Sequence, residues 1–104
     1  MGEKINCTIW DNGSRGWGIR VGSSNNMLHF REDIRSIKVD LDGNFFSFNL
    51  TNTFWTSCPE FRGSAIRRWL ERHGIDKRNK NDYVIELEII EPYRKFKATI
   101  IKKL

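Results

Sequence analysis

The sequence has few cysteines and prolines and no long apolar stretch, and each of these absences argues against a class of protein. It has two cysteines and two prolines in 104 residues, and its longest apolar stretches, such as YVIELEII, are interrupted by charge. A membrane-spanning helix needs about 20 apolar residues, so we expect no membrane association. The amino terminus shows no basic region followed by an apolar stretch, so no signal peptide is predicted. Together these absences predict a cytoplasmic protein.

Metal and cofactor motifs are also missing. Cys7 and Cys58 are far apart and lack the spacing of a zinc site, which predicts two buried thiols. The two histidines, His29 and His73, are isolated from each other and from the cysteines, so no metal site is expected. The sequence has no Gly-rich phosphate loop, G-x-S-x-G or C-x-x-C motif, and no cofactor is predicted.

One acidic pattern is compatible with catalysis. Glu86 and Glu88 share a face of a predicted strand with Asp82 nearby, and such carboxylates can hold a divalent ion for phosphodiester cleavage. Alternation on a solvent-facing strand produces the same pair without chemistry, and we favour this interpretation. A small phosphodiesterase or ribonuclease is therefore only the third hypothesis, and a non-enzyme is expected.

What the sequence does contain is a concentration of positive charge. Residues 1–53 hold six Lys and Arg against six Asp and Glu, whereas residues 54–104 hold twelve against seven and account for the net charge of +5. Within residues 62–80 only Glu71 and Asp76 oppose seven cations. These are Arg62, Arg67, Arg68, Arg72, Lys77, Arg78 and Lys80. Such a cluster attracts polyanions such as nucleic acid, and acidic protein surfaces as well.

Apolar residues at every second position predict strands in the first half of the chain and again at its end. The predicted strands are residues 4–10, 17–21, 27–30, 34–41, 45–50, 83–90 and 93–101. Asp42-Gly43 lies between the fourth and fifth and predicts a type I′ hairpin turn. Length and composition, with 38% hydrophobic residues, are typical of one globular domain over residues 1–104.

Helical spacing replaces the strand pattern after Thr53. Ser57 and Glu60 match a capping box, which predicts a helix from Ser57. Gly63 is unfavourable inside a helix, so a later start with Ser64 as the cap is the alternative. The predicted apolar side of the helix comprises Ala65, Ile66, Trp69, Leu70 and His73, and Gly74 stands at its end.

Seven short strands with one helix inserted between the fifth and sixth predict an α+β fold. It is either a β-rich antiparallel meander or a small, partly open barrel. The order of elements resembles that of DNA-binding pseudobarrels and other small nucleic-acid-binding barrels, as a likeness of architecture alone.

Arg62 needs a special arrangement, because a helix from Ser57 would place its charge in the apolar stripe. Either the helix begins at Ser64 and Arg62 lies outside it, or the first turn overhangs the core, or a buried salt bridge neutralises the charge. The first two arrangements leave Arg62 near Trp55, where guanidinium and indole together suit a phosphate and a stacked base.

The remaining aromatic residues have two interpretations. Trp69 lies in the apolar stripe and is expected in the core, whereas Trp55 stands at the strand-to-helix junction and is either core or platform. Phe45 and Trp10 alternate away from the inner faces of their strands. On an open sheet they would stack on bases; in a closed sheet they would form a secondary cluster under the helix, which we favour.

The leading hypothesis is a non-catalytic domain that binds DNA or RNA. Arginine at every basic helix position suits bidentate phosphate contacts, and the following loop is expected to be flexible. The predicted contacts are Arg62, Arg67, Arg68, Arg72, Lys77, Arg78, Lys80 and Trp55. Sequence preference would come from Arg62, Trp55 or the turn residues Asn12, Ser14 and Arg15. The alternatives are a protein-interaction or accessory module that binds an acidic partner, and a helix surface that serves only solubility.

Overall fold

The computed structural model describes residues 3–13 and 16–103. Its strands are β1 (Lys4–Asp11), β2 (Trp17–Arg20), β3 (Ser36–Leu41), β4 (Asn44–Asn49), β5 (Glu60–Arg62), β6 (Tyr83–Glu91) and β7 (Lys95–Lys102). Its α-helices are α1 (Asn25–Leu28) and α2 (Ser64–Arg72), and single 3-10 turns occupy η1 (Asn52–Trp55) and η2 (Lys80–Asp82).

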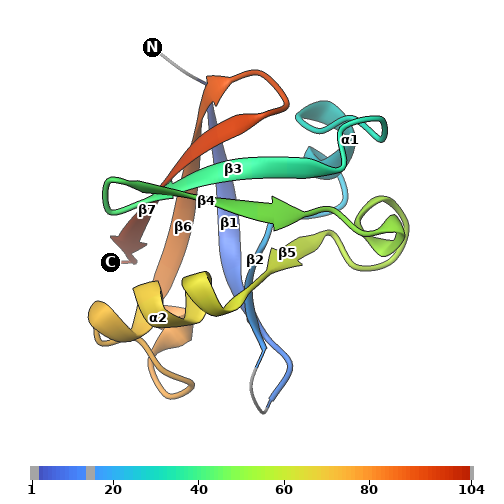
Figure 1. Ribbon diagram of the computed structural model, residues 1–104. Coiled ribbons are helices and arrows are strands. Elements are labelled where there is room, and N and C mark those ends of the chain that lie inside the picture. Colours follow the sequence, from blue (N-terminus) through green and yellow to red (C-terminus); the bar gives the residue numbers. More distant parts are fainter. Residues whose placement is uncertain (1–2, 14–15, 104) are drawn as a thin grey trace.

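The strands form one curled sheet in the order β4-β3-β7-β6-β1-β2-β5 (Figure 1). The curl brings the two outer strands, β4 and β5, close to each other without hydrogen-bonded pairing between them. The predicted partly open barrel, with a helix between the fifth and sixth strands, is therefore confirmed. The sheet is mixed rather than antiparallel, because β3 and β7 run parallel, and the simple meander is wrong.

The inner faces of the strands make the core as the alternation predicted. Ile5, Cys7 and Ile9 of β1 are buried, and so are the inward residues of β3 and the centre of β6. The fully buried side chains include Ile19, Ile37, Val39, Leu41, Ile85, Leu87 and Phe96. α2 lies across one end of the barrel and α1 lies at the other end (Figure 1).

The β3–β4 connection is the predicted two-residue turn. Asp42 and Gly43 have φ angles of 56° and 95°, as a type I′ turn requires, and Leu41 pairs with Asn44 on either side of it. The Asp40 carboxylate accepts a hydrogen bond from the Gly43 N–H, which further fixes the turn.

The predicted strand at residues 27–30 is wrong, because the chain forms α1 there. The Asn26 amide is buried and donates to the Phe54 carbonyl oxygen at 2.8 Å, a contact from a distant part of the sequence. Leu28 and Phe30 would share a face in a strand, but Leu28 is 66% exposed, whereas Phe30 is buried. Alternation of two apolar residues was too short a pattern to define a strand.

The capping box at Ser57 does not form, and the helix begins at Ser64. Residues 60–62 pair with β2 as strand β5, and the Val21 N–H donates to the Pro59 carbonyl oxygen. This pairing buries Phe61 in the core. Ile66, Trp69 and Leu70 are buried as predicted. His73 instead follows the helix and is exposed.

The two cysteines differ in burial. Cys7 is buried as predicted, and burial raises the pKa of its thiol to about 12. Cys58 is only half-buried, so the prediction of a second core thiol is wrong. Both thiols are free.

Candidate nucleic-acid interface

The outer face of α2 carries exposed arginines opposite its buried stripe. Arg67 pairs with Glu71 one turn along the helix at 3.4 Å. Arg68 donates to the Ser64 hydroxyl at 3.2 Å. In the part of the chain that the structure describes, neither Arg68 nor Arg72 has a carboxylate at ion-pair distance. Arg72 still interacts with the Asp42 carboxylate over a longer distance, so Arg68 is the least compensated cation of the helix.

Arg62 lies outside the helix, as the first of its three arrangements required. It is on the outer face of β5 with its side chain 51% exposed, and its guanidinium carbon lies 4.8 Å from the centre of the Trp10 ring. Gly18 stands between the two residues in the paired strands and leaves room for this contact. The expected pairing of Arg62 with Trp55 is wrong: Trp55 is half-buried, and its cationic neighbour is Arg35, at 5.4 Å.

A buried carboxylate beside Arg62 was not predicted. The Glu60 side chain is 1% exposed and lies 3.8 Å from Arg20 and 3.9 Å from Arg62, both of which are about half exposed. Residues that pair directly across strands, and every second residue along one strand, point to the same face of a sheet. The outer face of β1, β2 and β5 therefore carries Trp10, Arg20, Glu60 and Arg62 together. Strand alternation in β1 and β2 places Trp10 and Arg20 on the outer face, but no sequence pattern indicated that β5 would pair with β2.

We call the exposed cations of β2, β5 and α2 the basic surface. It comprises Arg20, Arg62, Arg67, Arg68 and Arg72. The five arginines lie on neighbouring elements, because α2 follows β5 directly and packs against β2. Glu60 and Glu71 form ion pairs with this surface, and Asp42 interacts with Arg72 over a longer distance. Three carboxylates thus oppose five guanidinium groups, and the surface remains positive.

The loop after α2 is anchored rather than free. Lys80 pairs with Asp11 at 2.9 Å, and Lys77 donates to the Gly13 carbonyl oxygen, so both lysines tie the loop to the β1–β2 turn. The hydrogen bond from Lys80 lowers the pKa of Asp11. Arg78 pairs with Asp76 at 3.4 Å but is 92% exposed. The expectation of a flexible loop is therefore wrong.

The side chain of Asn12 shapes the β1–β2 turn by accepting a hydrogen bond from the Gly16 N–H at 2.9 Å. Ser14 and Arg15, the other two turn residues predicted to give sequence preference, lie outside the described residues. Asn12 is exposed beside the anchored loop.

Phe45 and Trp10 do not form a cluster under the helix. Both lie on the outer face of the sheet, where Phe45 is 48% exposed with Lys95 at 5.9 Å from its ring centre, and Trp10 is half-buried beneath Arg62. The barrel curls as expected, but its outer face keeps these aromatic residues.

The acidic pattern on β6 has an ordinary explanation. Glu86 pairs with Lys4 at 3.6 Å, and among the described residues no three His, Cys, Asp or Glu side chains gather as metal ligands would. Within the same part of the chain, no helix has the length and apolar character needed to cross a bilayer.

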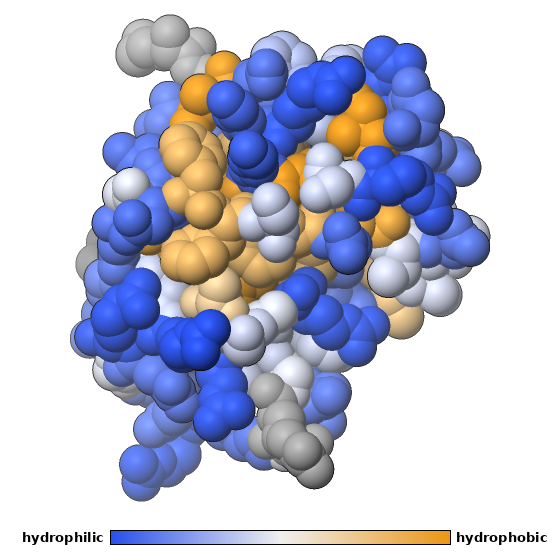
Figure 2. All heavy atoms as spheres, viewed as in Figure 1, coloured by the Kyte–Doolittle hydropathy of each residue, from blue (hydrophilic) through white to orange (hydrophobic). Residues whose placement is uncertain are grey.

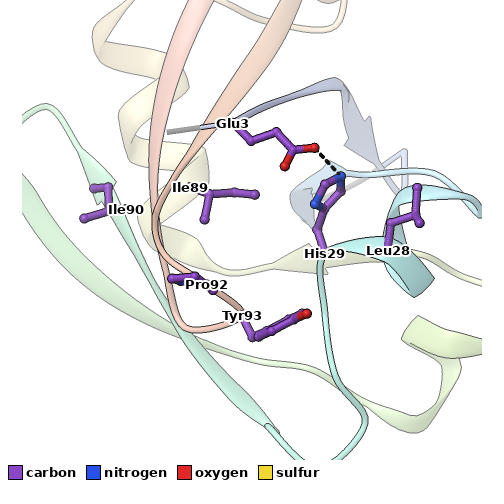
Figure 3. Close-up of a pocket in the computed structure, with 7 residues that line it drawn as sticks. All are labelled: Glu3, Leu28, His29, Ile89, Ile90, Pro92 and Tyr93. Carbon is purple, nitrogen blue, oxygen red and sulfur yellow. Dashed lines mark ion pairs between the residues drawn. The ribbon is translucent and has the colours of Figure 1, made fainter. Parts of the chain in front are cut away.

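A second surface feature lies at the opposite end of the barrel. Figure 3 shows a hollow between α1 and the β6–β7 hairpin, with Ile89, Pro92 and Tyr93 on one side and Leu28 and His29 on the other. Its volume is about 650 Å³, and a His29–Glu3 ion pair at 3.7 Å forms one wall. The hollow is mostly apolar, and none of its described lining residues belongs to the basic surface.

No known protein family, characterised protein or solved structure matches this chain. The function therefore has to follow from the geometry of its surfaces.

Proposed function

We propose that the protein is a non-catalytic domain that binds DNA or RNA through the phosphate backbone. The observation that supports this most directly is the basic surface, where five arginines from β2, β5 and α2 form ion pairs with only two carboxylates, Glu60 and Glu71, and a third, Asp42, acts on Arg72 over a longer distance. Guanidinium groups contact phosphates in a bidentate fashion, and clustered cations release counterions on binding.

The residues have different roles in this proposal. Arg68 and Arg72 bind phosphates most strongly, because no carboxylate competes for them at ion-pair distance within the described chain. Arg67 contributes after its exposed pair with Glu71 opens, at a cost below about 1 kcal/mol. Arg62 and Arg20 share the single charge of Glu60 and therefore keep a net positive charge between them.

The loop residues contribute in a second way. Lys77 and Lys80 hold the loop against the β1–β2 turn, so their main role is to position Arg78, which is almost fully exposed. Trp10, beneath Arg62, is the aromatic residue best placed to contact a base edge or sugar next to a bound phosphate. Trp55 remains a predicted contact, with Arg35 as its neighbour.

The test is fluorescence anisotropy with labelled single-stranded and duplex DNA and RNA at about 50 and 200 mM salt. Replacing Arg67, Arg68 and Arg72 together by Ala should weaken binding to unrelated sequences alike and reduce the salt slope by about 2 to 3. The matched control removes three cations outside the basic surface, Lys4 at the start of β1, Arg31 after α1 and Arg94 in the β6–β7 turn, and should leave the slope nearly unchanged.

Two outcomes would contradict the proposal. One is the absence of saturable binding at the lower salt concentration. The other is equal weakening by both triple variants, which would mean that net charge rather than the basic surface determines affinity.

A further inference from the structure

The hollow between α1 and the β6–β7 hairpin has the size of a small-molecule site. Its volume of about 650 Å³ lies within the range of about 300 to 1,000 Å³ that ligand pockets occupy. Apolar side chains form most of its lining, as they do in such pockets. The proposed nucleic-acid contacts include none of its described lining residues, so that function does not account for the hollow.

Hydrophobic side chains at this hollow remain in contact with solvent. Leu28 of α1 and Ile90 of β6 both line it and are exposed. Figure 2 shows hydrophobic side chains at the surface beside the β6–β7 hairpin and beside α1, with hydrophilic side chains around them. Grouped apolar exposure that is bordered by polar residues marks an interaction site.

Tyr93 forms part of the wall at a cost in backbone strain. The Arg94 N–H donates to the Glu91 carbonyl oxygen at 3.0 Å, which closes a β-turn with Pro92 and Tyr93 at its centre. Tyr93 has a φ of 68°, and the proline before it fixes a negative φ, so the turn is type II. Glycine or asparagine is usual at this position. Strain of this kind is retained at functional sites, which points to a role for the tyrosine ring itself.

Two hydrogen-bond acceptors lie together at one end of the hollow (Figure 3). His29 Nε2 lies 3.7 Å from a Glu3 carboxylate oxygen, which is longer than a hydrogen bond, so the carboxylate keeps its capacity to accept. A neutral imidazole with its proton on Nε2, toward Glu3, leaves Nδ1 as a second acceptor. Among the described residues, none donates a hydrogen bond to either group.

The charge of the lining favours a cationic end group on the ligand. With a neutral imidazole, Glu3 carries the only formal charge among the described lining residues, and its side chain is 70% exposed. A neighbouring cation, Arg31, lies 5.7 Å from the centre of the Tyr93 ring but is held by Asp33 through hydrogen bonds of 3.0 and 2.9 Å. An ammonium group needs acceptors alone, and Glu3 and His29 supply them.

We propose that this hollow binds a small organic amine. The apolar body of the ligand lies between Leu28, Ile89 and the Tyr93 ring, and its ammonium group donates to the Glu3 carboxylate and to His29 Nδ1. The hollow is larger than one lysine side chain, so we assign it to a free amine rather than to a side chain of a partner protein. This inference concerns a different surface and a different ligand from the proposed nucleic-acid function, so either can fail without the other.

The test uses three probes that share an apolar ring system and differ in their end group. They are naphthylethylamine, naphthylethanol and naphthylpropionate, and two-dimensional NMR of the labelled protein at neutral pH measures each Kd. The amine should bind about threefold or more tightly than the alcohol, and the carboxylate more weakly than either. The shifted amide signals should be those of Leu28, His29 and Tyr93.

Variants separate the roles of the charge and the ring. Glu3→Gln should weaken the amine by about threefold or more and change the alcohol by less than about twofold. Tyr93→Gly relieves the positive φ and should keep the fold in circular dichroism, while both probes bind about tenfold more weakly. The matched control is Phe45→Ala, which removes another exposed aromatic ring, from the outer face of β4, and should leave both affinities unchanged. If Tyr93→Gly does not fold, Leu28→Ala at an exposed side chain takes its place.

The absence of saturable amine binding would overturn the proposal, and so would equal affinities for the amine and the alcohol. Unchanged binding in Glu3→Gln, or in the variant that tests the wall, would do the same. A capped tripeptide with a central lysine that binds more tightly than naphthylethylamine would assign the hollow to a partner protein instead. Self-association in sedimentation that Leu28→Ala abolishes would also overturn the proposal, since the occupant would then be a second copy.

Discussion

Asp42 joins the β3–β4 turn to the carboxyl end of α2. Its carboxylate accepts hydrogen bonds from the Trp69 indole N–H at 3.1 Å and from His73 Nε2 at 2.8 Å. The bond from His73, together with that from Trp69, lowers the pKa of Asp42. One exposed residue thus holds the helix that carries the basic surface against the sheet.

The lowered pKa gives a pH dependence of stability. The folded-state pKa of Asp42 lies below its unfolded value of about 3.9, so its contribution is present above that pH and is lost as the pH falls through the folded-state pKa. Asn at this position tolerates the positive φ of the turn, so Asp42→Asn removes mainly the charge.

We expect Asp42→Asn to lower the free energy of unfolding at neutral pH by less than about 1 kcal/mol, the usual range for exposed ion pairs. The difference from wild type should shrink toward zero in urea unfolding at about pH 2.5. A difference that stays constant with pH would show that the carboxylate charge has no role.

Residues of the candidate site were predicted unequally. Arg67, Arg68 and Arg72 were found because helical spacing places them opposite the buried Ile66 and Trp69. The sequence did not reveal that Arg62 would lie over Trp10, because this contact depends on the β1–β2–β5 pairing, which joins residues about fifty positions apart.

β5 is the element that the sequence analysis misassigned most clearly. Glu60 matches a capping box with Ser57, and residues 60–62 were therefore predicted as the first turn of the helix. Pairing with β2 instead satisfies their backbone groups and buries Phe61. Tertiary pairing of this kind overrides local propensity in short segments. The helix start moved to Ser64 as a result, and Arg62 became a surface strand residue.

Two glycines beside β5 test how tightly this element is held. A Cβ at Gly18 would overlap the Phe61 carbonyl oxygen of the paired strand, whereas a Cβ at Gly63 would lie 3.1 Å from a Phe48 ring carbon that can shift. Gly18→Ala should therefore lower the free energy of unfolding by about 2 to 3 kcal/mol and Gly63→Ala by about 1 kcal/mol or less.

Chemical denaturation of the two glycine variants measures both values. Gly63 has a φ of 172°, which any residue adopts, so alanine at this position adds no backbone strain to the loss of stability. Equal losses in the two variants, or a neutral Gly18→Ala, would contradict the close approach of β2 and β5.

At the scale of the whole molecule, the inner strands of the sheet are hydrogen-bonded on both sides, whereas the two outer strands are bonded on one side only. β6, β1 and β7 each have hydrogen-bonded neighbours on both sides, and β6 contributes the fully buried Ile85 and Leu87. β4 and β5 have one neighbour each. Local stability should follow this order, because opening an outer strand breaks fewer contacts.

Amide hydrogen exchange of the free protein should therefore be slowest in β6 and in the parts of β1 and β7 that pair with it. In a two-residue hairpin the residues beside the turn exchange both hydrogen bonds, so the amides of Ser47 and Asn49 in β4 point away from β3. These two amides should exchange fastest among the strand residues. Uniform protection across the sheet would mean that β4 and β5 pair in solution, which would close the barrel.

The sequence by itself determined which side chains face inward, where the β3–β4 turn lies, that one basic helix precedes the last hairpin, and that the excess charge lies in residues 62–80. Each of these depends on periodicity, turn chemistry or composition over a few residues. The tertiary structure decided the parallel pairing of β3 with β7, the strand at β5, the anchoring of Lys77 and Lys80, and the approach of β4 to β5. These features depend on contacts between segments far apart in the chain. A pattern over a few neighbouring residues does not show which of these distant segments will pair.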